Sequence, residues 1–379
     1  MPDPEARPVH EVIVSPYMGR YVMVKPGSKA GGTMPAYRYR ELAEAASDAP
    51  APEWLAAAAR EAWGVELEGK PLSPHVLVRD DPGLGYGRAS WELNLGCNYE
   101  CPHCYLGLKK FEGLEWTDRI KLLHTLRDAG VLWLQMTGGE PMVDRLFAET
   151  YTAAYDLGMM ITLLSNGSRL FLPGILDLLA NRPPDRITLS VYGGTEAGYD
   201  KTTGRRGAFR LFSKGLTAAH EAGLPLSLSM IVTQDNAGEA HLMRAMAEQI
   251  GVPMDEYTNM VPTIYGGDET LPTQSAAHLR KRKTFTGCNA GHTFFHVNPF
   301  GKASICKVGR DPNIDLITEG VEGLRGLGAI ADSLLLRQGG CTGCQLQGTC
   351  GTCMPLVQLY RKAKAPLATY CQHREKEPV

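Results

Sequence analysis

The sequence lacks a strong charge bias, a long apolar run and an export signal. Its 39 Lys and Arg residues nearly balance 41 Asp and Glu residues, and the net charge is −2. Bulk electrostatics therefore favours neither nucleic acid nor an anionic membrane as a partner. No apolar stretch reaches the about 18 residues that a membrane-spanning helix needs. Because residues 1–11 lack the charged-then-apolar layout of a secretory signal, we expect a cytoplasmic protein.

Low-complexity tracts are also missing, and the composition is that of a folded protein. Hydrophobic residues make up 44% of the chain and charged residues 21%, which argues against disorder. The length of 379 residues permits two or three domains with buried cores that need no covalent staples.

Cysteine is absent from the first 96 residues, yet the chain has ten cysteines in two groups. Cys97, Cys101 and Cys104 fall within eight residues, and seven more lie between Cys288 and Cys371. In a chain without an export signal, clustered cysteines indicate metal ligands or redox groups rather than structural disulfides.

Residues 1–87 are predicted to form a small α+β module. Two strands, within residues 11–16 and 20–28, are joined by a turn at Met18 and Gly19. Two amphipathic helices are expected at residues 39–46 and 52–65, followed by a strand at 75–80.

Residues 88–270 alternate between strand and helix patterns. The predicted strands are rich in β-branched and bulky apolar residues and cover residues 91–95, 131–137, 160–165, 186–192, 226–232 and 255–261. Helical patterns lie between them at residues 118–130, 147–158, 175–181, 209–223 and 240–251. Such βα units predict an α/β fold, either a partial parallel (β/α)6 barrel with its site at the strand C-termini or an open doubly wound sheet. Residues 271–379 are loop-rich, with a hairpin expected at 294–306.

The first cysteine group follows the first predicted barrel strand with the spacing C-x3-C-x2-C. Three thiolates on one tight loop can bind three irons of a cubane cluster and leave the fourth iron open. The alternative is a zinc site completed by His103, but only one cysteine pair has the usual C-x2-C spacing.

This arrangement resembles the radical S-adenosylmethionine (SAM) superfamily. The resemblance implies that Cys97, Cys101 and Cys104 are catalytic ligands of a [4Fe-4S] cluster whose fourth iron chelates SAM. It also places His103 and the backbone of Tyr105 beside the adenine.

Further SAM contacts are implied at the ends of the later strands. The family's motif for the SAM amino group resembles the segment Gly138, Gly139, Glu140 and Pro141. The glycines would let the backbone approach the ligand closely, and the Glu140 carboxylate would accept a hydrogen bond from the ammonium group. Ser165, Asn166 and Ser190 offer hydroxyl and amide groups for ribose or carboxylate, and Arg205 offers a fork for the SAM carboxylate. Val232 lies where related enzymes contact adenine. Taken one at a time, these segments are equally compatible with ordinary turns.

The C-terminal cysteines resemble the SPASM extension of radical SAM enzymes, which carries two auxiliary [4Fe-4S] clusters. By that resemblance Cys341, Cys344, Cys350 and Cys371 ligate the outer cluster, and Cys288, Cys306 and Cys353 the inner one. The spacing before Cys353 is one residue shorter than usual, and the fourth inner ligand stays open. A zinc ribbon formed by residues 341–353 is the alternative.

The resemblance implies a peptide-modifying oxidoreductase that uses a 5′-deoxyadenosyl radical to abstract hydrogen, with a precursor peptide as substrate. An external one-electron donor such as flavodoxin or ferredoxin would supply the electron. The barrel interior is expected to be lined by apolar strands, which keep hydrogen donors away from the radical.

Five residues are candidate neighbours of the substrate: Tyr192, Asp200, Tyr257, Tyr265 and Asp268. Residues 1–87 are either a leader-peptide recognition module or a cap on the barrel. A small-molecule substrate, such as a sugar or porphyrin, and a non-catalytic zinc protein are the competing hypotheses.

Overall fold

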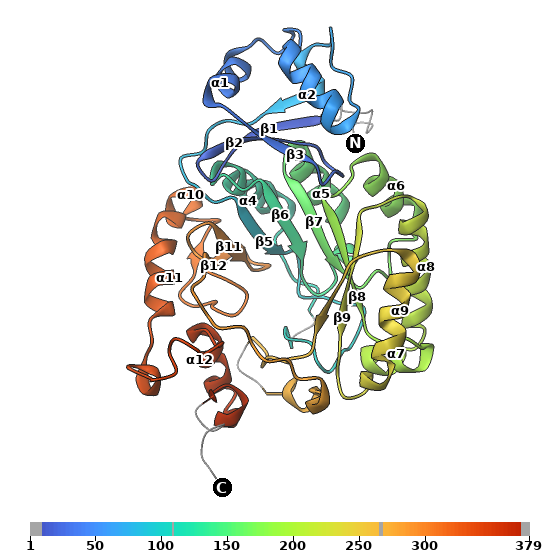
Figure 1. Cartoon of the computed structure of the whole chain (residues 1–379), viewed down its shortest axis with the longest axis vertical. Helices are drawn as coiled ribbons and strands as arrows, with labels where there is room; N and C mark the ends of the chain where they lie inside the picture. Colours follow the sequence, from blue (N-terminus) through green and yellow to red (C-terminus); the bar gives the residue numbers. More distant parts are fainter. Residues whose placement is uncertain (1–9, 108–109, 265–267, 373–379) are drawn as a thin grey trace.

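The computed structural model describes residues 10–107, 110–264 and 268–372, which form two sheets (Figure 1). A four-stranded sheet belongs to the N-terminal module, and a nine-stranded sheet runs through the rest of the chain. Tyr265, one of the candidate substrate neighbours, lies outside the described residues.

The N-terminal module is the predicted hairpin with two helices on one face. Its strand order is β3-β2-β1-β4, with bounds β1 Val12–Tyr17, β2 Arg20–Val24, β3 Gly31–Met34 and β4 Val76–Val78. Met18 and Gly19 both have positive φ, at 49° and 76°, as the predicted tight turn requires. The helices are α1 Ala36–Glu44, α2 Glu53–Trp63 and the short α3 Leu72–His75. β3 was not predicted, because two of its four residues are glycine.

The other face of this small sheet packs on the barrel. Ile13, Val22 and Val24 form an apolar cluster with Leu132 and Met160, which lie at the starts of β6 and β7. The module therefore covers the strand N-termini, at the end of the sheet opposite the cysteine loop (Figure 1).

Six parallel strands pair in chain order and confirm the partial barrel, which is open rather than closed. Their bounds are β5 Arg88–Glu92, β6 Trp133–Thr137, β7 Met160–Ser165, β8 Arg186–Val191, β9 Leu226–Ile231 and β10 Met254–Tyr257. The covering helices are α4 Trp116–Asp128, α5 Phe147–Asp156, α6 Pro173–Asn181, α7 Glu196–Thr203, α8 Ala208–Glu221 and α9 Ala240–Ile250. α6, α8 and α9 lie along the outer side of the sheet in Figure 1.

The expectation of an apolar barrel interior holds for part of its lining, such as Leu164 and Ile231. Strand side chains alternate, and the apolar set, for example Leu163, Leu189 and Met230, is buried in the core under the helices. The alternate positions face inward, and polar groups such as Thr162, Thr188 and Ser229 stand among the apolar ones there. The apolar composition of these strands is therefore explained by the helices they pack against.

The cysteine-rich region continues the barrel sheet. β11 Phe294–Val297 pairs in parallel with β5, and β12 Lys302–Ser304 and β13 Ile314–Asp315 follow it with antiparallel pairing. The predicted hairpin at residues 294–306 is thus confirmed, and the sheet order is β10-β9-β8-β7-β6-β5-β11-β12-β13. The later helices are α10 Gly320–Gly323, α11 Leu327–Leu335 and α12 Met354–Lys362.

No helix within the described residues is both long and apolar enough to cross a membrane.

Candidate active site

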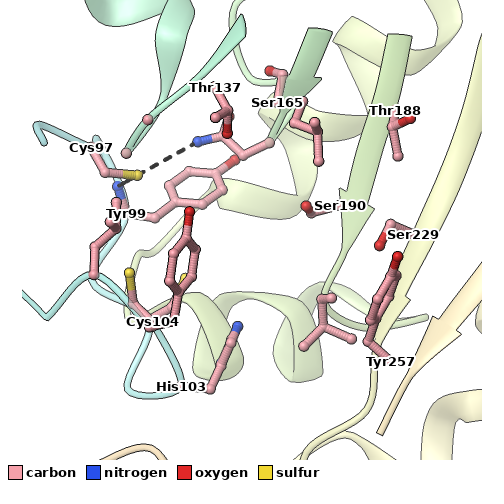
Figure 2. Close-up of a pocket in the computed structure, with 18 of the residues that line it drawn as sticks. Cys97, Tyr99, His103, Cys104, Thr137, Ser165, Thr188, Ser190, Ser229 and Tyr257 are labelled. Carbon is pink, nitrogen blue, oxygen red and sulfur yellow. Dashed lines mark hydrogen bonds between the residues drawn. The ribbon is translucent and has the colours of Figure 1, made fainter. Parts of the chain in front are cut away.

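The main cavity lies at the C-terminal ends of the barrel strands and has a volume of about 550 Å³. Cys97, Cys101 and Cys104 line one side of it, and residues from β6 to β10 line the rest. Figure 2 shows Cys97, Cys104 and His103 on one side, facing Ser190, Ser229 and Tyr257 across the cavity. The three predicted cluster ligands thus share one cavity with the inward-facing side chains of the barrel strands.

Contacts from neighbouring elements hold the cysteine loop in place. The Tyr99 amide donates to Cys97 Sγ at 3.4 Å, and the Glu100 amide donates to the Thr203 carbonyl at 2.8 Å. Arg205 donates to the Asn98 carbonyl, and its guanidinium lies 5.9 Å from the Tyr99 ring centroid. Arg205 therefore braces the loop and is not among the residues that line the cavity.

The turn that ends β7 holds the same loop. Asn166 Nδ2 donates to Asn98 Oδ1 at 2.8 Å and approaches Cys97 Sγ at 3.9 Å. Asn98 Nδ2 in turn donates to Ser168 Oγ at 2.8 Å. Asn166 and Ser165 both line the cavity, as predicted, but their polar groups already make intramolecular bonds.

Glu140 connects the ends of β6 and β7. Its buried carboxylate accepts from Ser165 Oγ at 2.8 Å, from the Asn166 amide at 2.7 Å and from the Met142 amide at 3.1 Å. Burial raises the pKa of Glu140 to about 7, although these hydrogen bonds oppose the rise. Neither Glu140 nor Pro141 lines the cavity; Pro141 begins the 3-10 turn Pro141–Val143.

Gly138 and Gly139 line the cavity, and they also pack against the chain that leads into the cysteine loop. A Cβ on Gly139 would lie 2.1 Å from the Gly96 carbonyl oxygen, and one on Gly138 would lie 2.5 Å from the Asn94 carbonyl oxygen. The Glu140 amide donates to the Gly96 carbonyl at 2.9 Å. Glycine is required here for close approach of two backbone segments.

His103 and Tyr105 both line the cavity beside the cysteines. The His103 ring lies 5.3 Å from the Tyr192 ring, and burial raises the pKa of Tyr192 well above its usual value. The Tyr105 carbonyl accepts from the Ile264 amide at 2.8 Å. Of the remaining predicted contacts, Ser190 lines the cavity, whereas Val232 is fully buried and does not.

Two candidate substrate neighbours have different placements. Tyr257 lines the cavity, whereas Asp200 lies in α7, a helix that the sequence patterns did not predict. Asp200 accepts from the amides of Gly207 and Phe209 and so caps the start of α8. Asp200 is therefore structural in this fold, and Asp268 is not among the lining residues.

Sequence reasoning missed most of the polar lining. Each strand from β6 to β10 contributes at least one inward polar residue, and in strand order these include Gln135, Thr162, Thr188, Ser229 and Asp255. The alternation along each strand was the available signal, since Thr188 and Ser190 are separated by one residue, as are Ser227 and Ser229. Lys307, next to Cys306, also lines the cavity, which no local pattern indicated.

A buried ion pair joins β5 to the C-terminal cysteine region. The Glu92 carboxylate accepts hydrogen bonds from both terminal nitrogens of Arg310, at 3.0 Å and 2.7 Å. It also accepts a hydrogen bond from Tyr105 Oη at 3.2 Å. Burial alone would raise the pKa of Glu92, but His296 and Arg310 hold it below its usual range. Because burial lowers the pKa of His296 to about 4, Arg310 is the main counter-charge.

The C-terminal cysteines lie in two places. Cys341, Cys344, Cys350 and Cys371 line one cavity of about 230 Å³, together with Arg337 and Arg361. Cys353 does not line that cavity. Burial raises the pKa of Cys306, and the neighbouring thiols of Cys353 and Cys288 raise it further. The four-plus-three partition of cluster ligands stays a prediction, while the structure places four of the thiols around one cavity and Cys306 near Cys353 and Cys288.

Within the described ranges, no three His, Cys, Asp or Glu side chains converge where they could hold a single metal ion. The three thiols of the cysteine loop instead line one wall of the main cavity. Soft thiolate donors spread around a space suit the separate irons of a cubane cluster.

Comparison with known proteins agrees with this geometry. Residues 91–246 match the Radical SAM superfamily. AdoMet-dependent heme synthase of Nitratidesulfovibrio vulgaris is 28% identical over 177 residues, which cover 46% of this chain and 48% of that protein. PqqA peptide cyclase of Gluconobacter oxydans is 29% identical over 163 residues, which cover 42% of this chain and 45% of that protein. The chain spans about half the length of the curated relatives it matches.

A solved structure has the same fold over a longer range. Streptococcus suis SuiB bound to precursor peptide SuiA aligns with a TM-score of 0.56 and 14% identity, covering 76% of each chain. Residues 91–246 therefore match the Radical SAM superfamily, and the chain is similar in sequence to a PqqA peptide cyclase and to an AdoMet-dependent heme synthase.

Proposed function

We propose that this chain is a radical SAM enzyme that abstracts hydrogen from a peptide and leaves a cross-linked or oxidised side chain in a ribosomally made product. The observation that carries the proposal is the placement of Cys97, Cys101 and Cys104 on one wall of a cavity that extends into the barrel interior. Similarity to a PqqA peptide cyclase and to the fold of SuiB supports a peptide substrate.

The three thiolates would hold a [4Fe-4S] cluster at the ends of the strands. When bound, that cluster and SAM supply a 5′-deoxyadenosyl radical for hydrogen abstraction. The residues of the chain keep the loop rigid: Asn166 and Arg205 hold it from two sides. Backbone at Gly138 and Gly139 and the hydroxyls of Thr137 and Ser190 face the cavity and are available to SAM.

The C-terminal cysteines would hold two auxiliary [4Fe-4S] clusters. Because Cys306 precedes Lys307, which lines the main cavity, the inner cluster would lie nearer to the substrate space than the outer one. This order suits removal of an electron from the substrate toward the protein surface, and a flavodoxin or ferredoxin would reduce the first cluster.

The N-terminal module would bind the leader segment of the substrate. β3 pairs only with β2 among the described residues, so its other edge is open to an added strand. Residues Gly31 to Thr33 are exposed there. Because the opposite face of the sheet packs on the barrel, the module is also a cap, and the two roles are compatible.

A small-molecule substrate is the second candidate. Its support is the similarity to AdoMet-dependent heme synthases, which share a comparable length of sequence with this chain. The polar cavity accepts peptide or small polar molecules alike, so substrate identity separates the two candidates.

Replacement of Cys97 tests the chemistry. Cys97→Ala should abolish formation of 5′-deoxyadenosine from SAM under reducing conditions, because the loop then offers two thiolates. Metal analysis of the wild-type protein should find about twelve irons for three cubane clusters. Stoichiometric zinc without iron, or undiminished 5′-deoxyadenosine from the variant, would contradict the assignment.

The peptide assignment has its own test. Short peptides encoded beside the gene are incubated with enzyme, SAM and reductant, and their masses are measured. A loss of two hydrogens supports cross-linking or oxidation. Unchanged masses, together with turnover of a porphyrin, favour the second candidate.

A further inference from the structure

A second cavity lies at the opposite end of the barrel, where the strands begin. This strand-start chamber has a volume of about 630 Å³, and parts of three regions line it. Tyr17 and Met18 come from the hairpin of the N-terminal module, and Asn289 and Thr293 come from the segment before β11. The remaining walls are the first residues of the barrel strands.

The chamber meets the main cavity at one row of side chains. Gln135, Thr162 and Arg186 line both cavities. They are direct neighbours across the sheet, since Gln135 pairs with Thr162 and Thr162 pairs with Arg186. The interior of the barrel therefore runs from the cysteine loop to the N-terminal module, with this row as its neck.

Charge in the chamber is predominantly positive. Arg88 and Arg186 face it, against a single carboxylate, Asp185. Burial raises the pKa of Asp185, and a hydrogen bond from Trp133 opposes the rise. Arg88 donates to Tyr17 Oη at 3.2 Å and lies 5.9 Å from the Trp133 ring centroid. Arg186 is exposed and lies close enough to Asp185 to lower the pKa of that carboxyl, but its guanidinium makes no hydrogen bond within the part of the chain that the structure describes, so its five donors remain available.

We infer that the strand-start chamber binds a carboxylate of the substrate peptide, with Arg186 as its anchor and Arg88 beside it. The inference rests on the proposed peptide substrate and extends it to an acidic one. A guanidinium matches a carboxylate with two parallel hydrogen bonds, and an exposed fork whose donors make no hydrogen bond favours an anionic ligand. Gln135 and Thr162 can hydrogen-bond the adjoining peptide backbone.

The same geometry relates the anchor to the reacting residue. Arg186 and Ser190 are four residues apart on β8, a rise of about 13 Å at ~3.3 Å per residue. Ser190 lies at the level of the cysteine loop, across the cavity from Cys97 (Figure 2). An extended peptide with its carboxylate on Arg186 thus places a residue about four positions away at the height where hydrogen is abstracted.

A binding experiment tests the inference with a defined probe. Fluorescein-labelled acetyl-(Gly-Glu)4-amide is titrated with the full-length, cluster-loaded enzyme, and anisotropy is measured. We expect the Arg88→Gln/Arg186→Gln double variant to bind this peptide at least tenfold more weakly than wild type. Arg186→Lys should fall between them, because it retains the charge and loses the fork. The neutral acetyl-(Gly-Gln)4-amide should bind weakly to all three proteins.

A matched control removes an arginine elsewhere. Arg325 is paired with Glu322 on the surface, far along the chain from the barrel strands, and Arg325→Gln should bind the acidic peptide as wild type does. Circular dichroism verifies folding, and Arg186→Lys decides the question if the double variant does not fold.

Two results would overturn the inference. One result is that wild type and Arg186→Lys bind the acidic peptide with equal affinity, and that the double variant, if it folds, also binds it equally well. The other is displacement of the peptide by free glutarate at the same concentration as by unlabelled peptide, which would show a small-acid site. Formation of 5′-deoxyadenosine without peptide is measured in parallel, so that failure of the radical chemistry is distinguished from failure of the carboxylate site.

Discussion

At the scale of single residues, buried charges have partners that sequence motifs do not reveal. Glu140 stands in a motif associated with the SAM amino group, yet its carboxylate accepts from Ser165, Asn166 and Met142. Glu92 has no recognisable motif, yet it is fully buried and paired with Arg310, 218 positions away. A buried carboxylate needs such donors wherever they lie in the chain.

The Glu92–Arg310 pair leads to a stability prediction. Arg310→Met leaves Glu92 buried without its main counter-charge and should lower the free energy of unfolding by about 3 kcal/mol. Arg310→Lys keeps the charge but loses the two-pronged contact, and should cost less. Denaturant titration of the wild type and both variants measures the difference. Equal losses for Met and Lys would show that packing, and not charge, governs this site.

At the scale of elements, the ends of β5, β6 and β7 are assembled by backbone contact. The turn after β6 lies so close to the chain before Cys97 that only glycine fits at Gly139. The turn after β7 then reaches Asn98 through Asn166. The cysteine loop is consequently held by both neighbouring strands.

Gly139→Ala should disturb this contact. Its new Cβ would lie 2.1 Å from the Gly96 carbonyl oxygen, so the backbone must shift at a cost of about 1–3 kcal/mol. We expect lower iron content after cluster reconstitution. The matched control is Gly174→Ala in α6, where no atom lies within 4 Å of the added Cβ and iron content should be unchanged. Wild-type iron content in Gly139→Ala would disprove the positioning role.

At the scale of the whole molecule, the N-terminal module and the cysteine-rich region are both joined to the barrel. Ile13 and its neighbours pack on the starts of β6 and β7, while β11 extends the barrel sheet at β5. The module and the segment before β11 also share the strand-start chamber. Contacts between regions therefore complete both cavities.

Undocking of the module tests this assembly. Ile13 is fully buried against the barrel, so Ile13→Asp should separate the module and speed proteolytic cleavage within residues 80–87. Tyr37→Asp, on the exposed side of α1 in the same module, should be cleaved at the wild-type rate. The rate of fragment formation under limited proteolysis is the measurement, and equal rates for both variants would argue against tight docking.

Sequence by itself determined the features that depend on neighbouring residues. The cysteine spacing, the hairpin at Met18 and Gly19 and the βα alternation all follow from local patterns. Hydrophobic periodicity and turn chemistry act over a few residues, so they are legible without a fold.

Only the tertiary structure decided which polar groups face the cavity and which partners they have. Inward and outward positions of a strand are assigned by what packs on each face, and the helices here cover the apolar one. Of the predicted SAM contacts, Glu140, Arg205 and Val232 do not line the cavity. Thr188, Ser229 and Arg186, which were not predicted, do line it. Such contacts join residues far apart in sequence, and folding alone brings them together.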